Sequence, residues 1–178
     1  MLTLDAAEHV HPEDWAALLQ TNLYSATDVL GILYPEMVKR GQGEIVLISS
    51  CSAFSGFPYA TPYAVSKAGM LGAIRSLEHE VRGTGVTLCL ACPGYVETEI
   101  FKKSTHRTIE FPRFWEGILS MRLPFISAEN AAQKIIAQVT RKKSIHVFPI
   151  PYRILTFLSQ RFPLILTPFF KMLHRATK

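Results

Sequence analysis

The chain has 178 residues, 48% of them hydrophobic, which is enough for one globular domain with a sizeable core. Its cysteines and histidines show no spacing typical of metal ligands or of a disulfide framework, so we expect no metal site. The net charge of +5 is unevenly distributed: the last 49 residues hold nine Lys and Arg and no carboxylate, which leaves the first 129 residues at −4. This asymmetry argues against a nucleic-acid-binding domain.

No segment of the sequence is typical of secretion or of a membrane-spanning helix. The N-terminal residues lack the basic and apolar regions of a signal peptide. The uncharged apolar stretch from 162 to 170 is too short to cross a bilayer. We therefore expect a cytoplasmic protein that is able to associate with a membrane surface.

The first half of the chain alternates helical and strand patterns. Apolar residues at three- and four-residue steps predict a long helix from Glu13 to Val38. Short, apolar, β-branched runs are typical of buried parallel strands, and a helical pattern lies between two of them. We expect a βαβ unit made of a strand, a loop, a helix and a strand, at residues 44–49, 50–62, 63–81 and 86–91.

The second half begins with residues 93–125, which show no sustained period and mix aromatic with charged side chains, as lids and binding loops do. A helix from Ser127 to about Val139 and a short strand at 145–150 should follow, with Pro149 placing the strand end at an edge. These elements predict an α/β fold with a Rossmann-like, doubly wound parallel sheet. We divide the chain into residues 1–150, which form this domain, and a basic aromatic tail at 151–178.

Two interpretations of the tail stay open. Its mixture of large apolar and basic residues fits an amphipathic segment on anionic lipid. It fits equally a C-terminal helix that closes a substrate pocket or contacts a second subunit, although Pro163 and Pro168 interrupt any long helix. Both interpretations of the tail favour a hydrophobic substrate. The segment before it supports the same conclusion, because six of its large apolar residues would line an apolar pocket: Phe101, Phe111, Phe114, Trp115, Met121 and Phe125.

The candidate chemistry centres on Tyr63 and Lys67, a Y-x-x-x-K pair on one face of a predicted helix. A neighbouring ammonium favours the phenolate and should lower the tyrosine pKa, which makes the phenol usable as a general acid or base. Alone, the pattern also fits a helix-surface pair. Ser50 and Pro93-Gly94 strengthen the catalytic interpretation, because they follow the two strands directly, and open α/β sheets place active sites at the carboxyl ends of their strands.

Three motifs in this order and spacing resemble those of the short-chain dehydrogenases/reductases: residues 43–50 (GEIVLISS), 63–69 (YAVSKAG) and 92–98 (CPGYVET). The resemblance implies that Ser50 hydrogen-bonds the reacting carbonyl and that Tyr63 donates or accepts the proton. It implies that Lys67 holds the nicotinamide ribose and tunes the tyrosine. Asn22 would anchor a water in the proton relay of the family.

The cofactor implied by the resemblance is NADP or NAD, held by Tyr63 and Lys67 together with four residues after the second strand. These four would pack on the nicotinamide and bind its carboxamide, with the last one also near the pyrophosphate: Pro93, Gly94, Val96 and Thr98. The implied reaction is hydride transfer between the cofactor and a secondary alcohol or ketone of a hydrophobic substrate, such as a lipid, a steroid or a retinoid. A homo-oligomer is expected, and no nucleic-acid partner.

Two signatures of the family are not found in the sequence, the Gly-rich T-G-x-x-x-G-x-G turn and the N-N-A-G motif. Both would lie upstream of Met1, together with roughly 80 to 90 residues that hold the first four strands. We favour a fragment of a complete enzyme, because the motif residues that are present are intact. A truncated product that binds no cofactor and a partner-dependent half are the other interpretations. The alternative function is a non-catalytic interaction or membrane-surface protein.

Overall fold

The computed structural model describes residues 1–120, 122–168 and 170–171. Met121, named above, and residues 169 and 172–178 of the tail lie outside the described ones. Within the described part of the chain, no helix is both long and apolar enough to cross a bilayer. In the same residues, no group of three or more His, Cys, Asp and Glu is arranged to hold a metal ion.

A parallel sheet forms the centre of the structure, with its described strands in the order β1-β2-β3. Ile45 pairs with Leu88 across the first two strands, and Leu90 pairs with Ile145 across the second and third. The middle strand, β2, is almost wholly buried. The α/β fold with a parallel sheet is therefore confirmed, and its strands are β1 (Gly43–Ile48), β2 (Val86–Pro93) and β3 (Ile145–Phe148).

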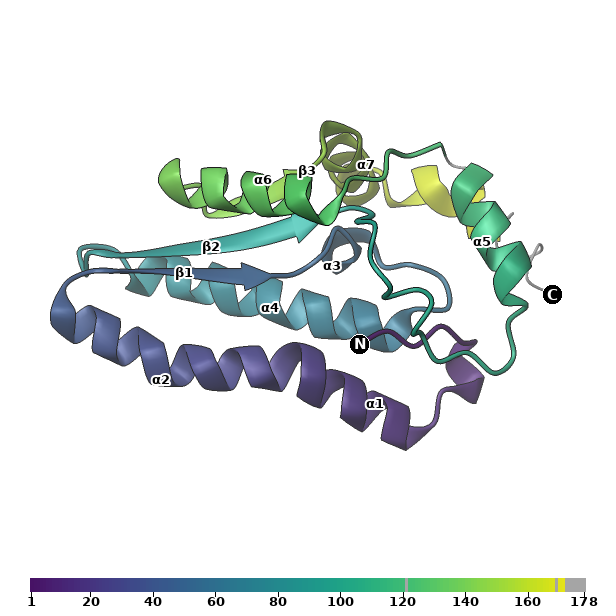
Figure 1. The fold of residues 1–178 in the computed structure, drawn as a ribbon, viewed down its shortest axis with the longest axis horizontal. Coiled ribbons are helices and arrows are strands. Elements are labelled where there is room, and N and C mark those ends of the chain that lie inside the picture. The colour runs from purple at the N-terminus through teal and green to yellow at the C-terminus, as the bar shows by residue number, and fades with distance from the viewer. Residues whose placement is uncertain (121, 169, 172–178) are drawn as a thin grey trace.

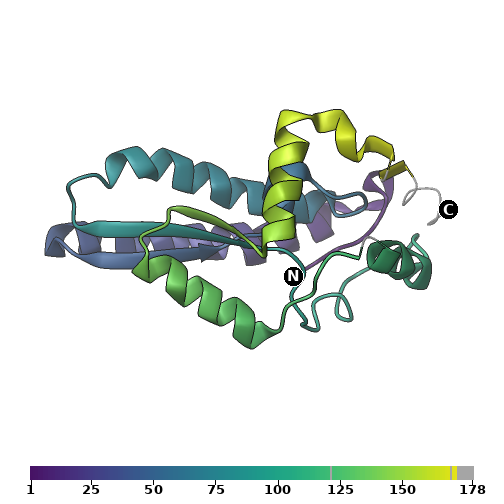
Figure 2. The same cartoon turned by 90° about the horizontal axis from the view of Figure 1, so that it is seen from above.

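Helices cover both faces of this sheet. The helices α1, α2 and α4 lie on one side, and α6 and α7 lie on the other, as Figures 1 and 2 show. The 3-10 turn η1 (Ala7–His9) precedes α1. The remaining elements are α1 (Pro12–Leu19), η2 (Gln20–Tyr24), α2 (Ser25–Arg40), α3 (Ser52–Ser55), α4 (Thr61–Glu80), α5 (Phe111–Ser120), α6 (Ala128–Thr140), α7 (Ile150–Arg161) and η3 (Pro163–Leu166).

The largest core cluster fills the space between the sheet and the helices α2 and α4. Met70 and Ile74 of α4 are buried there against Leu88 and Leu90 of β2. Gly69 lets α4 approach η2 closely, since a Cβ at this position would lie 2.8 Å from a methyl carbon of Leu23. The fit of α4 under β1 and β2 fixes where the first turn of α4 lies relative to the strand ends.

A polar network joins the N-terminal segment to the segment that follows β2. The buried carboxylate of Asp5 accepts the backbone N–H groups of Arg107 and Thr108, each at 3.1 Å, and the Thr108 hydroxyl. Arg107 also forms two hydrogen bonds with the Asp14 carboxylate, at 2.6 and 3.1 Å, and this contact lowers the pKa of Asp14. The network fixes the base of the segment between β2 and α6.

The structure differs from the expected elements in several places. The expected loop at 50–62 contains α3, and α4 begins at Thr61 because Pro62 suits a first helical turn. The long N-terminal helix contains a π-helical turn, η2. Residues 93–125, expected to lack regular structure, contain α5, which buries Phe114 and Ile118 at a four-residue spacing. The last strand stops at Phe148, and Ile150 already begins α7.

Two glycines in the turn before β2 provide a stability test. Gly83 and Gly85 both have positive φ, but only a Cβ at Gly85 would collide with backbone, 1.9 Å from the carbonyl oxygen of Gly41. Gly83→Ala should therefore lower the free energy of unfolding by only about 1–2 kcal/mol, which is the strain of a left-handed backbone conformation. Gly85→Ala should cost roughly 3 kcal/mol or more, because the contact between α2 and β2 must open. Urea unfolding measures both, and equal losses would contradict this packing.

Candidate active site

Ser50 is held where β1 and β2 end. The pairing of these strands continues past β1, since Ser49 N–H donates to Ala91 at 2.8 Å and Cys51 N–H donates to Pro93 at 3.0 Å. Ser50 lies between these two bonds and is 7% exposed. Its hydroxyl accepts the N–H of Ser52, the first residue of α3, at 3.2 Å. The short helix α3 therefore fixes the direction of the Ser50 side chain.

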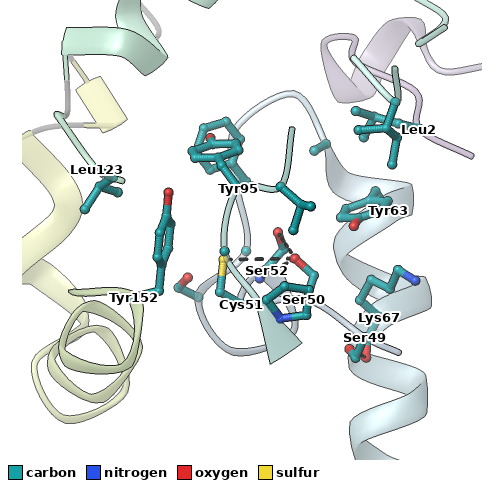
Figure 3. A pocket seen from close by; sticks show the side chains of 18 of the residues that line it. Leu2, Ser49, Ser50, Cys51, Ser52, Tyr63, Lys67, Tyr95, Leu123 and Tyr152 are labelled. Atoms are coloured by element: carbon teal, nitrogen blue, oxygen red, sulfur yellow. Dashed lines mark hydrogen bonds between the residues drawn. The ribbon is translucent and has the colours of Figure 1, made fainter. Parts of the chain in front are cut away.

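Tyr63 lies in the first turn of α4 and faces Ser50 (Figure 3). The two side chains border the same cavity. Lys67 lies one turn further along α4, where its ammonium donates to the carbonyl of Ile48 at 3.1 Å and is 5.6 Å from the centre of the Tyr63 ring. The structure thus brings Ser50, Tyr63 and Lys67 together, as the sequence predicted.

Burial dominates the electrostatics of these residues. It raises the pKa of Tyr63 to about 12, and the hydrogen bond from Ser50 opposes this rise only in part. Burial also lowers the pKa of Lys67 to about 8, while Cys92 acts in the opposite direction. The expected lowering of the tyrosine pKa was wrong for this structure, because burial of the phenol raises its pKa by more than neighbouring groups lower it.

Asn22 lies in the π-helical turn η2, a type of distortion that is frequent at functional sites. Its amide donates to the Met1 carbonyl at 2.9 Å and to the Ser66 hydroxyl at 3.4 Å, and its oxygen accepts the Met1 amino group at 2.9 Å. Asn22 is thus connected to α4 through the neighbour of Lys67. Its role as a water anchor stays a prediction.

The end of β2 forms the opposite wall of the site, with Pro93, Gly94, Val96 and Thr98 all at the same cavity. Gly94 is required by packing, since a Cβ there would lie 2.3 Å from the ring of Tyr152. Tyr152 is anchored in turn by its hydroxyl, which donates to the Pro124 carbonyl at 3.1 Å. The tail helix α7 therefore packs directly on the backbone that was expected to meet the nicotinamide.

The cavity between these walls has a volume of about 270 Å³. Ser50, Tyr63 and Lys67 border it, and most of its other lining is apolar (Figure 3). Among the aromatic residues expected here, Phe101 and Phe114 line it, and three more pack behind them: Phe111, Trp115 and Phe125. Sequence reasoning missed lining residues of the N-terminal segment, of α3 and its N-cap, and of α7, among them Leu2, Leu4, Cys51, Ser52, Tyr152 and Leu155.

Comparison with known proteins decides the family. The family model described as short chain dehydrogenase matches residues 2–108. The chain belongs to the short-chain dehydrogenase/reductase family. It shares this membership with a ketoacyl reductase, HetN, of Nostoc sp., to which it is 31% identical over 134 residues, covering 75% of this chain and 44% of the relative.

Two further relatives of this short-chain dehydrogenase are the 3-oxoacyl-[acyl-carrier-protein] reductase FabG of Thermotoga maritima and the acetoacetyl-CoA reductase of Rhizobium meliloti. The first is 34% identical over 98 residues, 55% of this chain and 40% of the relative. The second is 36% identical over 102 residues, 57% of this chain and 42% of the relative. The chain spans about half the length of the curated relatives that it matches.

Two solved structures share the fold. A short-chain dehydrogenase from Sphingobium yanoikuyae, solved in complex with NADPH, superposes with a TM-score of 0.72 at 19% identity, over 93% of this chain and 61% of that one. A Thermus thermophilus protein superposes with a TM-score of 0.70 at 21% identity, over 86% of this chain and 66% of that one. These likenesses confirm the Rossmann-like fold.

The buried ammonium of Lys67 predicts a pH effect on stability. Because its pKa is lowered to about 8 in the folded chain, unfolded chains bind more protons between about pH 8 and pH 10. Lys67 should therefore add stability over this window as pH rises, and Lys67→Met should lose this contribution. The thiols of Cys51 and Cys92, whose pKa values are raised to about 11 and 12, act in the opposite direction in both chains, so the difference between the two curves isolates Lys67. Urea unfolding at several pH values measures it, with Lys39→Met on the exposed surface as the control for losing a charge. Parallel curves for the native chain and Lys67→Met would contradict the buried ammonium.

Proposed function

We propose that the chain carries the catalytic centre of an NAD(P)-dependent oxidoreductase that interconverts a ketone and a secondary alcohol on a hydrophobic substrate. One observation carries the proposal: Ser50 and Tyr63 border the same largely apolar cavity, with the Lys67 ammonium one helical turn away. Two hydroxyl donors beside each other suit a carbonyl oxygen, which accepts two hydrogen bonds.

The residues around the cavity fit the nicotinamide end of the cofactor. A volume of about 270 Å³ is just below the range of about 300–1,000 Å³ typical of ligand pockets, so it suits one ring and a reacting group but not a whole dinucleotide. Pro93, Gly94 and Val96 offer a flat apolar wall, and Thr98 offers a hydroxyl. When bound, the nicotinamide supplies or accepts the hydride. Lys67 would hold its ribose hydroxyls.

The protonation of Tyr63 favours the direction of carbonyl reduction. With a pKa raised to about 12, the phenol keeps its proton at neutral pH. It is therefore ready to donate this proton to the oxygen of a substrate whose carbon receives hydride. Ser50, which borders the same cavity, would hold the same oxygen in place. Asn22 and Ser66 would support the proton path from behind α4.

The substrate class that we favour is a 3-oxoacyl chain. The names of the relatives, a ketoacyl reductase, a 3-oxoacyl reductase and an acetoacetyl-CoA reductase, support this choice. The apolar lining, with Phe101, Phe114 and Leu155, suits the hydrocarbon part of such a substrate. Steroid and retinoid carbonyls, which the apolar pocket also suits, serve as comparison substrates.

The remaining parts of the proposal concern organisation. We propose that residues 1–150 form the catalytic half of the cofactor-binding domain and that residues 151–178 form a tail that contacts a membrane surface. A homo-oligomer is supported by the outward apolar residues of α2, namely Val29, Ile32 and Leu33. NADPH is the first cofactor to test, because the Sphingobium yanoikuyae neighbour was solved with it.

The test is reduction of an acetoacetyl thioester, followed by the oxidation of NADPH or NADH. Tyr63→Phe should lower turnover roughly 100-fold or more, since it removes only the proton donor. Tyr24→Phe makes the same change at an exposed phenol and is the matched control. Steroid and retinoid ketones in the same assay identify the substrate class.

Two outcomes would overturn the proposal. If Tyr63→Phe and Tyr24→Phe retain equal turnover, then Tyr63 is not the proton donor. If the chain neither binds NADPH and NADH nor acts on any of the ketones, alone or joined to a segment that carries the Gly-rich motif, then the enzyme proposal fails. The non-catalytic interaction protein would take its place.

A further inference from the structure

The helix α7 buries polar side chains and exposes apolar ones. Its inward face buries the hydroxyl side chains of Thr156 and Ser159, which bond to carbonyl groups of their own helix. Its outward face carries Ile150, Ile154 and Phe157, which are 62%, 54% and 65% exposed. Because steps of four and three residues place these three on one stripe, they form a continuous apolar surface. A helix at the surface of a globular protein normally turns its apolar side chains to the core and its polar side chains to water.

The exposed apolar surface continues past the end of α7. Phe162 is 55% exposed and Leu164, in η3, is 79% exposed. We call these two residues and the stripe Ile150, Ile154 and Phe157 the outer face of α7. Contiguous apolar surface of this kind marks a site of interaction with a protein or a membrane.

Basic side chains lie on α7 and on the elements beside it. Arg153 and Arg161 are exposed on α7 itself. Burial is the main cause that lowers the pKa of His146 in β3. Four nearby cations lower it further: Lys143, Arg153, Lys134 and Arg141. They come from α6, the turn after it and α7, which lie on the same side of the sheet in Figures 1 and 2. The carboxylates near these elements are Glu129, at the start of α6, and Glu78, which binds Ser144. No carboxylate follows Glu129 in the sequence.

We propose that the outer face of α7 docks on an anionic lipid bilayer. An apolar stripe with flanking cations matches the interface between acyl chains and anionic headgroups. A second copy of this chain is a poorer occupant. A two-fold contact through α7 would bring Arg153 and Arg161 close to the same residues of the other copy, where like charges repel.

Docking at this face would bring the cavity wall to the bilayer. Leu155, on α7, and Leu166 and Phe170, after it, line the candidate active site. A hydrophobic ketone dissolved in the bilayer would therefore reach the cavity along apolar side chains. This step rests on the proposed reductase function, whereas the docking itself does not.

The test is cosedimentation of the protein with phosphatidylcholine vesicles, prepared with and without phosphatidylserine. Binding should require phosphatidylserine and weaken as salt rises. The double variant that combines Ile154→Ser with Phe157→Ser should weaken vesicle binding roughly tenfold or more. Arg153→Gln should weaken it about fivefold. Val65→Ser, which removes an exposed apolar side chain from α4 on the opposite side of the sheet, should leave binding unchanged.

Three results would overturn the docking surface. The first is equal binding to both kinds of vesicle, and the second is native-like binding by the α7 variants. The third is a dimer that dissociates in the α7 variants, measured by light scattering, which would assign the outer face to a second copy. Binding by the native chain tests the proposal even if a variant fails to fold. Because no cofactor or turnover is involved, a failure here is separate from a failure of the reductase proposal.

Discussion

The candidate site depends on the contact between the end of β1 and the helix α4. The Ser49 hydroxyl donates to the carbonyl of Lys67 at 2.9 Å, and the Lys67 ammonium donates to the carbonyl of Ile48 at 3.1 Å. These reciprocal bonds fix the helix along the strand end, so that Tyr63, one turn before Lys67, lies beside Ser50. The pairing of β1 with β2 then places Pro93 and Gly94 across the cavity. The side chains of Ser50 and Lys67 are thus positioned by hydrogen bonds to backbone groups of neighbouring elements.

Burial is the largest influence on the pKa values of the titratable groups at this contact. Desolvation favours the neutral forms, so it raises the pKa of Tyr63 and lowers that of Lys67. Ser50 opposes the shift of Tyr63 only partly. The result is a protonated phenol, suited to donate, close to an ammonium that gives up its proton more easily than a solvated one does. A protonated Tyr63 beside Lys67 is consistent with a general acid for carbonyl reduction.

The sequence predicted the parts of this site that depend on local pattern. Buried strands are apolar throughout, and Tyr63 and Lys67 are one helical turn apart in any helix, so both could be read from the chain. Contacts between distant segments could not be read in this way. The packing of Tyr152 on Gly94, the bonds of Asn22 to Met1 and the buried carboxylate of Asp5 join residues that no periodicity connects. The pKa of Tyr63 was mispredicted for the same reason, because its burial depends on the whole fold.

The central claim is that β1, β2 and α4 build a nicotinamide site from residues of this chain. Reduced nicotinamide mononucleotide tests it most directly, because it carries only the half of the cofactor that these residues would hold. Its fluorescence should rise in a saturable manner when the chain is added, and Lys67→Met should weaken the binding by removing the ammonium that holds the ribose. No saturable change, or equal affinity of the native chain and the variant, would contradict the account.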